Sequence, residues 1–430
     1  MKSIVALTLA TATSAIVLPE SFDGFNHFKD EIKHIPSHIS STLNKAVEHL
    51  SSEISDAITE DDILGSLSGS EYNIDLDGHD SSEYTIYELI SKSNYTEEFF
   101  KLVQDHKEVG HLLNDTNANL TLFAPIDKAF EHIPKDPEHK PSDGFVENVL
   151  NYHIGVGEYP AGRILFTHTL PTAFKESWLG DEPQRLRTSV GLSGVRVNVY
   201  SKVVAVNIKA KNGYIHAVNK ILIPPPMIGR VISLFPAQFS TLLLAYEKTE
   251  FVKYVHNVKM IGSTVFAPSN NAWQRLGPRA NAFLFNTDTG KKYLKALLKY
   301  QIVPNTTVYS DAIYYGDEKD ENTRSKNLLE TTGDFHIELP TLLEKSVGVD
   351  IHTWKGWTTM VVNGAAVVGF QDGIGKNGVV QVVRNVPIPP CKKGGSSTYV
   401  DGEIEVEDLK ERLDQYVEED EDDQDWTGEL

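Results

Sequence analysis

A short stretch that occurs twice constrains the fold of this chain more than any other feature. Residues 120–130 read LTLFAPIDKAF, and residues 263–273 read STVFAPSNNAW. β-branched and apolar residues predict a buried strand that ends at the proline, and Asp127 after Pro125 is placed to cap a following helix. Phe123 and Phe266 lie 143 residues apart, which is the length of a domain rather than of a solenoid repeat. The sequence therefore predicts a tandem duplication.

Each repeat places helical patterns first and strand patterns last. Apolar residues follow helical spacing over 87–113 and over 235–255, whereas the period changes to two from Gly194. Asn-Gly pairs supply the positive φ angles of tight hairpin turns at 212–213 and 363–364. Helices followed by antiparallel strands, twice over, predict an α+β architecture. The polar residues 304–356 are expected to form a looped excursion.

Charge is concentrated outside the repeats. Of the net charge of −20, residues 16–85 carry −12 and residues 401–430 carry −13, which leaves residues 86–400 near neutrality at +4. Because phosphate binding needs clustered Lys and Arg, nucleic acid is not expected as a partner. We expect residues 16–82 to form an acidic segment with an amphipathic helix, from the stripe of apolar residues between 39 and 58. Residues 391–430 hold too little apolar surface to pack and are predicted to be an acidic disordered tail.

The N-terminus indicates the secretory pathway. Residues 1–15 have the charged start, short apolar run and small residues of a signal peptide. No later run reaches the length of about 18 apolar residues that a membrane span needs, and the acidic C-terminus lacks the apolar tail of a GPI signal. A single cysteine, Cys391, excludes an intrachain disulfide. Four glycosylation sequons are expected to carry glycans, at Asn94, Asn114, Asn119 and Asn305.

No motif in the chain predicts a reaction. A nucleophile elbow, a phosphate-binding loop and a zinc-protease helix are all missing from the sequence. Residues 73–80 resemble the start of a calcium-binding EF-hand loop, but Asp80 and Tyr84 stand where an apolar residue and a glutamate are required. We interpret this stretch as a solvated linker and predict no metal site and no cofactor.

Three signatures in order resemble the fasciclin domain of extracellular and cell-surface adhesion proteins. They are the LFAP stretch, LNYHI at 150–154 and NGYIHAVNKIL at 212–222, followed by prolines. The resemblance covers residues 83–226 and 232–390. It implies two tandem domains, each a β-sandwich wedge packed with several helices and without enzyme activity.

The second repeat replaces both histidines of these signatures with glutamine. Gln301 stands where His153 stands in the first repeat, and Gln381 where His216 stands. Glutamine keeps a donor and an acceptor but cannot titrate near neutral pH, so we interpret the histidines as structural and expect both to share one environment. The residues predicted to be structural are Phe123, Pro125, His216, Phe266, Pro268, Gln301 and Gln381. Tyr152 and His153 match in type a Tyr-His pair implicated in integrin adhesion in animal relatives and are the candidate binding residues.

Two classes of function remain open. The first is an adhesion or binding module without catalysis, whose partner is a glycan, a cell-wall polymer or a cell-surface or extracellular protein. The second is a vacuolar or extracellular small-ligand carrier or enzyme with a pocket between the domains. A deep pocket with converging polar groups would favour the second. The cell wall, the extracellular space and the vacuole lumen all remain open as compartments.

Overall fold

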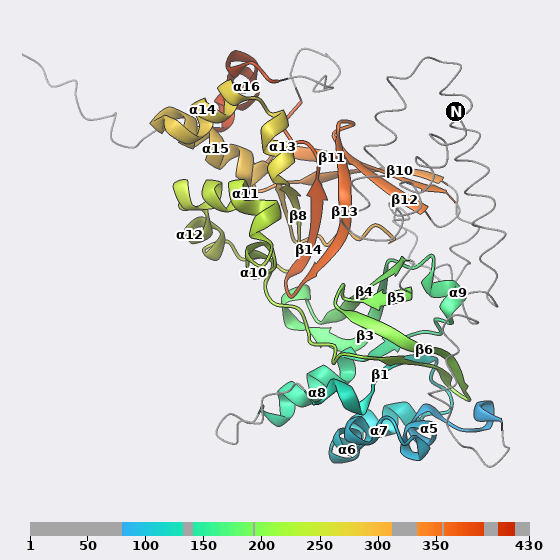
Figure 1. Ribbon diagram of the computed structural model, residues 1–430. Coiled ribbons are helices and arrows are strands. Elements are labelled where there is room, and N and C mark those ends of the chain that lie inside the picture. Colours follow the sequence, from blue (N-terminus) through green and yellow to red (C-terminus); the bar gives the residue numbers. More distant parts are fainter. Residues whose placement is uncertain are drawn as a thin grey trace, which may run out of the picture. The chain divides into compact units, whose positions relative to one another are not determined.

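The computed structural model describes the following residues: 80–131, 141–191, 194–311, 333–354, 357–390 and 403–417 (Figure 1). The predicted signal peptide, the amphipathic stripe at 39–58, most of the EF-hand-like stretch and Cys391 lie outside these ranges. The chain divides after Pro225 into two compact units, residues 1–225 and 226–430, which are described separately as domain 1 and domain 2.

Domain 1 starts with helices and ends in a sheet whose seven strands hydrogen-bond in sequence order, with β7 closing on β1. Its helices are α5 (Ile86–Lys92), α6 (Glu97–Asp105), α7 (Lys107–Asn114), α8 (Asp143–Tyr152) and α9 (Ala161–Ile164). Its strands are β1 (Leu120–Pro125), β2 (Ile154–Val156), β3 (Thr169–Glu176), β4 (Glu182–Gly191), β5 (Gly194–Val197), β6 (Ser201–Ala210) and β7 (Gly213–Val218).

Domain 2 repeats this order, with seven α-helices among its described residues against five among those of domain 1. Its helices are α10 (Ile228–Ser233), α11 (Pro236–Lys248), α12 (Phe251–His256), α13 (Asn270–Arg275), α14 (Pro278–Asn286), α15 (Asp288–Tyr300) and α16 (Val406–Leu413). Its strands are β8 (Ser263–Pro268), β9 (Ile302–Pro304), β10 (Gly333–Pro340), β11 (Ser346–Trp354), β12 (Trp357–Val362), β13 (Ala366–Gly375) and β14 (Gly378–Val383). They form one sheet in the order β10-β11-β12-β13-β14-β8-β9. The predicted α+β class is confirmed in both domains.

The repeated LFAP-type stretch forms a strand with a neighbour on either side in each domain, β1 and β8. β1 is buried along its whole length, lies antiparallel to β2 and runs parallel to β7, which places Phe123 opposite His216. β8 has the same relation to β9 and β14, with Phe266 opposite Gln381. In both copies the proline is the last residue of the strand. Its missing N–H therefore leaves the rest of the ladder intact.

Asp127 caps a different helix from the one predicted. A single 3₁₀ turn follows it, and its Oδ1 accepts the N–H of Glu98 at 2.9 Å. Glu98 lies in the first turn of α6, whose own N-cap residue Thr96 makes no capping hydrogen bond. The first-turn N–H groups of α6 therefore receive their acceptor from the β1 end. In domain 2, Asn270 accepts the N–H of Thr241 in the same way.

A glycine after each closing hairpin turn allows the strands to meet. Gly213 has φ +144°, and a Cβ there would lie 1.8 Å from the main-chain oxygen of Leu120. Gly378 has φ +141°, and a Cβ there would lie 1.9 Å from the oxygen of Ser263. Any side chain would separate the parallel pair of strands, so both positions require glycine.

The asparagine before each of these glycines acts through its side chain rather than through a positive φ. Asn212 Oδ1 accepts the N–H of Ile86 at the start of α5, at 2.9 Å. Asn377 Oδ1 accepts the N–H of Ile228 at the start of α10, also at 2.9 Å. The expectation of positive φ at Asn212 is therefore wrong, and the residue instead ties the hairpin to the start of α5, as Asn377 does for α10.

The predicted excursion at 304–356 contains two strands. β10 and β11 pair over their whole length, from Gly333 opposite Thr353 to Pro340 opposite Ser346. The hairpin was missed because its exposed positions are charged, although the half-buried Phe335, Ile337 and Leu339 alternate with them.

The predicted disordered tail contains an ordered helix. Ile404, Leu409 and Leu413 are buried in the core of domain 2, on and beside α16. Their spacing places them on one side of a helix, a signal that the acidic composition of the whole segment obscured. The prediction of disorder is therefore wrong for residues 403–417, while residues 418–430 lie outside the described part of the chain.

Candidate functional site

The predicted binding pair lies in the interior of domain 1. Tyr152 ends α8 and is fully buried, and its hydroxyl donates to the main-chain oxygen of Arg185 at 3.0 Å. The same hydroxyl accepts from Asn198 Nδ2 at 2.9 Å. In domain 2, Tyr300 repeats both contacts with Ser346 and Asn363. The tyrosine hydroxyl therefore joins the end of a helix to one strand and one hairpin turn in each domain.

His153 follows Tyr152 and uses both ring nitrogens on the main chain. Nδ1 donates to the oxygen of Val149 at 2.7 Å, and Nε2 accepts the N–H of Leu222 at 2.9 Å. The ring is fully buried, which lowers its pKa to about 4. His153 is therefore neutral near pH 7 and carries its proton on Nδ1.

His216 has the opposite arrangement. Nε2 donates to the oxygen of Tyr159 at 2.8 Å, and Nδ1 accepts the N–H of Asn207 at 3.3 Å. Burial lowers its pKa to about 4 as well, and its ring lies 5.5 Å from that of Phe123. Neither histidine has a free ring nitrogen, so these contacts leave no lone pair for a metal and no group for proton transfer.

These contacts do not support direct binding of a partner by Tyr152 and His153. Both side chains are fully buried, and the polar atoms of each are bonded within domain 1. We infer that the pair acts as an internal brace. This arrangement explains why the tyrosine recurs as Tyr300 in domain 2, where the fold needs the same contacts.

Gln381 performs the same two tasks in domain 2 that His216 performs in domain 1. Its Oε1 accepts the N–H of Asp372 at 3.0 Å, and its Nε2 donates to the oxygen of Val308 at 2.9 Å. Asp372 and its counterpart Asn207 both have positive φ, +60° and +57°. An amide therefore replaces the imidazole without loss of either main-chain contact.

Gln301 has a different relation to His153. Its Nε2 is buried without a hydrogen-bond partner in the described part of the chain. Leu222, whose N–H bonds His153, corresponds to Pro387, which has no N–H. The contact that His153 makes therefore has no equivalent in domain 2. The two substitutions have separate causes, and the prediction of one shared environment is wrong: each histidine has its own partners.

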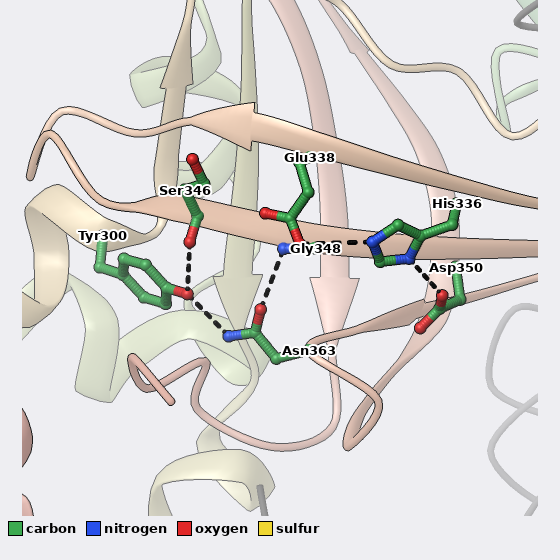
Figure 2. Close-up of polar contacts among 7 residues, drawn as sticks. All are labelled: Tyr300, His336, Glu338, Ser346, Gly348, Asp350 and Asn363. Atoms are coloured by element: carbon green, nitrogen blue, oxygen red, sulfur yellow. Dashed lines mark hydrogen bonds and ion pairs between the residues drawn. The ribbon is translucent and has the colours of Figure 1, made fainter. Parts of the chain in front are cut away.

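An exposed polar face was not predicted and lies on β10 and β11 (Figure 2). His336 stands between two carboxylates, with Nδ1 2.6 Å from Asp350 Oδ1 and Nε2 3.3 Å from Glu338 Oε1. His352 Nδ1 lies 2.8 Å from Asp334 Oδ1 one step along the same strand pair. Hydrogen bonds to Asp350 and Glu338 raise the pKa of His336. We call these five side chains the His-acid face.

The His-acid face is solvent-accessible, in contrast to the Tyr-His brace. His336 and His352 have 56% and 52% of their side-chain surface exposed. Within the described ranges, no set of three or more His, Cys, Asp and Glu side chains is arranged to hold a metal ion. The face presents imidazole and carboxylate groups side by side on an exposed strand pair.

A small cavity in domain 1 is apolar. It has a volume of about 20 Å³ and lies between α5, the turn after it and the central strands, with Ile90, Ala124 and Ile215 in its wall. This volume matches about one water molecule, far below the several hundred Å³ of a typical ligand pocket.

None of the helices in the described residues combines the length and the apolar character needed to cross a bilayer. The four sequon asparagines, Asn94, Asn114, Asn119 and Asn305, are all exposed. Asn119 immediately precedes β1 on the surface, as expected.

Two proteins of known name are similar to much of this chain. A protein from Gibberella zeae named aurofusarin biosynthesis cluster protein S is 26% identical over 325 residues, which cover 72% of this chain and 78% of that protein. Stabilin-2 from Rattus norvegicus is 28% identical over 235 residues, which cover 51% of this chain but only 15% of stabilin-2.

A solved structure of a FAS1 domain pair from the insect cell adhesion molecule Fasciclin I also matches. It is 17% identical, with a TM-score of 0.32, and the match covers 67% of this chain and 95% of that structure. The family model described as "Fasciclin domain" matches residues 94–224 and 237–389. The chain belongs to the fasciclin-domain family, and it carries two such domains in tandem.

Proposed function

We propose that this protein is a secretory-pathway glycoprotein that acts as a non-catalytic binding or adhesion module. The proposal rests on the hydrogen bonds of three residues in domain 1 that belong to the family's sequence signatures. The polar side-chain atoms of Tyr152, His153 and His216 are bonded internally, which leaves none of them to act on a substrate. Binding must then use the outer surface.

We place the contact on the His-acid face of domain 2. Alternating imidazole and carboxylate side chains on two paired strands suit hydrogen bonding to a polar partner, either a glycan, a cell-wall polymer or an extracellular protein. Two domains on one chain add avidity to contacts that are individually weak. Membership of the fasciclin-domain family, whose domains are associated with adhesion or binding, supports this class of function.

The compartment is tested with the full-length protein. A fluorescent tag is inserted within residues 418–430, and cells, wall and medium are fractionated. Signal in wall or medium, together with a mass decrease on endoglycosidase treatment, is the expected result. Residence in the vacuole with unglycosylated Asn94, Asn114, Asn119 and Asn305 would contradict the proposal.

The binding surface is tested with the purified protein on wall polysaccharides and surface-protein fractions. A variant carrying His336→Ala and His352→Ala should lose retention on the matrix that holds the wild type. The matched control removes an exposed pair in domain 1, Glu98 and Lys101, whose side chains lie 2.7 Å apart. Equal retention of both variants would exclude the His-acid face.

The alternative of a small-ligand carrier or enzyme receives some support from the name of the Gibberella relative, which refers to a biosynthesis cluster. The cavity of domain 1 does not favour it, because about 20 Å³ cannot hold a small organic molecule. A thermal-shift screen against a library of small metabolites separates the two classes. A saturable stabilisation by a small molecule would support the carrier.

A further inference from the structure

The C-terminal helix of domain 2 lies outside the fasciclin match, which ends at residue 389. Figure 1 shows α16 beside α14 and α15, and both helices contact it. The apolar side chains of Ile404, Leu409 and Leu413 are 5%, 0% and 0% exposed. We call the surface of α14 and α15 that receives them the α14–α15 face.

Directed contacts fix α16 on this face. The hydroxyl of Tyr293 on α15 donates to the carboxylate of Asp414. The Lys410 ammonium lies 5.0 Å from the ring centroid of Phe283 on α14. These contacts require an aspartate and a lysine at fixed positions of the docked segment, which an arbitrary apolar segment would not supply.

Charge also matches between the helix and the segment that contains the face. Arg279 of α14 lies 3.8 Å from Glu405. Lys295 and Lys299 lie over the ring of Tyr254. Residues 403–417 contain six acids and two bases, a net charge of −4. Residues 278–300, which include α14 and α15, contain five bases and one acid, a net charge of +4. Opposite net charges favour encounter and select an acidic partner.

Domain 1 shows that the fasciclin fold does not itself require such a covering helix. Phe145 on α8 occupies the position of Tyr293 on α15, when the helices are aligned at Tyr152 and Tyr300. Phe145 is 48% exposed, whereas Tyr293 is 8% exposed. The covered face is therefore an addition of domain 2.

We propose that the α14–α15 face is a docking site for an acidic amphipathic helix, and that its partner in trans is the 403–417 segment of a second copy of this chain. The segment carries every group that the face recognises, and twelve residues, 391–402, join it to the family domain. Exchange of the helix between copies reproduces the same contacts and needs no new surface. The resulting assembly joins two tandem pairs and multiplies weak surface contacts.

Two full-length variants test the exchange by complementation. The first carries Leu409→Asp and Leu413→Asp, which disable the helix and leave the face intact. The second carries Phe283→Glu, which places a carboxylate against the acidic helix and leaves the helix intact. An equimolar mixture should form a complex of one copy of each, with a mass in light scattering about twice that of either variant alone. Absence of the complex, with both variants folded by circular dichroism, would overturn the proposal.

A second measurement keeps the test decisive if the Phe283→Glu chain does not fold. A fluorescent peptide of residues 403–417 is titrated into the full-length Leu409→Asp/Leu413→Asp chain and into the wild type. Binding to the variant should be at least about tenfold tighter, because the wild-type face is filled in cis at a high effective concentration. A peptide with the same two aspartates is the control. Equal affinity for both chains, or no binding to the folded variant, would contradict the proposal.

Discussion

Domain 1 and domain 2 meet the same structural requirements with different residues. The hairpin glycine is identical in both, the histidine at 216 becomes a glutamine with the same two contacts, and the histidine at 153 becomes a glutamine with one amide nitrogen unpaired. The comparison separates what the fold fixes by sterics from what it fixes by hydrogen-bonding capacity. The former tolerates no side chain, whereas the latter tolerates an exchange only where the new group reaches both partners, as Gln381 does and Gln301 does not.

The largest effect is expected at the hairpin glycines. Gly213→Ala and Gly378→Ala each force a Cβ to within 2 Å of a main-chain oxygen. We expect each to lower the free energy of unfolding of its own domain by about 3 kcal/mol or more, because the parallel strand pair must separate. Hydrogen exchange of the intact chain reports on the two domains separately. Gly144→Ala and Gly229→Ala, where a Cβ meets nothing within 4 Å, are the controls, and equal losses in all four variants would contradict the steric explanation.

Acid should destabilise domain 1 more than domain 2. The pKa values of His153 and His216 fall from 6.5 to about 4 on folding, so the unfolded state binds more protons between these values. The stability they contribute is present above pH 6.5 and is lost as pH falls toward 4, by an amount on the order of 3 kcal/mol per histidine. Domain 2 has glutamine at both positions and lacks this loss.

The pKa of His336 is raised, so its contribution to domain 2 has the opposite sign and is present at low pH. Lowering the pH from 7 to 4.5 should therefore destabilise domain 1 more than domain 2. Hydrogen exchange measures the free energy of unfolding of each domain across this range. In a chain with His153→Gln and His216→Gln, the two domains should respond to acid almost equally. A steeper acid response in domain 2 would refute this assignment.

Replacing each histidine by glutamine should lower the free energy of unfolding of domain 1 by a different amount. His216→Gln should lower the free energy of unfolding by less than about 1 kcal/mol, because Gln381 shows that an amide reaches both main-chain groups. His153→Gln should cost about 1–3 kcal/mol, because the N–H of Leu222 loses its acceptor in a buried site. Urea denaturation of the two variants gives the comparison, and the reverse order of costs would break it.

The smallest effect concerns a turn. Val199 has φ +69°, which is an unfavourable conformation for a β-branched residue, and domain 2 has Gly364 at φ +66° in the corresponding three-residue turn. Val199→Gly should raise the free energy of unfolding of domain 1 by about 1 kcal/mol, and Gly364→Val should lower that of domain 2 by a similar amount. Thermal melts of both variants measure the effect. A loss of stability in Val199→Gly would mean that contacts of the valine outweigh its backbone strain.

The sequence was most informative where local chemistry and tertiary structure agree. The LFAP-type stretches are buried strands, and Asn363-Gly364 forms the predicted turn between β12 and β13. Both features depend on residues adjacent in the chain. The class of fold was predictable for the same reason.

The errors arise where the deciding contact is distant in sequence. Asp127 bonds Glu98 rather than the helix that follows it, and His153 depends on Leu222. Composition averaged over long windows obscured β10 and α16, in which charged residues cover a small set of buried apolar ones. The His-acid face was missed with them, because its residues converge only once β10 and β11 are paired.

The parallel pairing of β1 with β7 has a consequence for how the protein is made. Leu120 lies opposite Gly213, so β1 cannot complete its pairing until a strand that is translated 93 residues later has been made. At a synthesis rate of roughly 5–20 residues per second this delay lasts several seconds, during which β1 has only the β2 side to pair with. Domain 1 therefore completes its sheet only after nearly all of it has left the ribosome, and its folding rate is limited by a long-range closure. The same holds for β8 in domain 2, where Thr264 lies opposite Val379, 115 residues later, so each domain exposes a strand that is fully buried after folding until its last strand has been made.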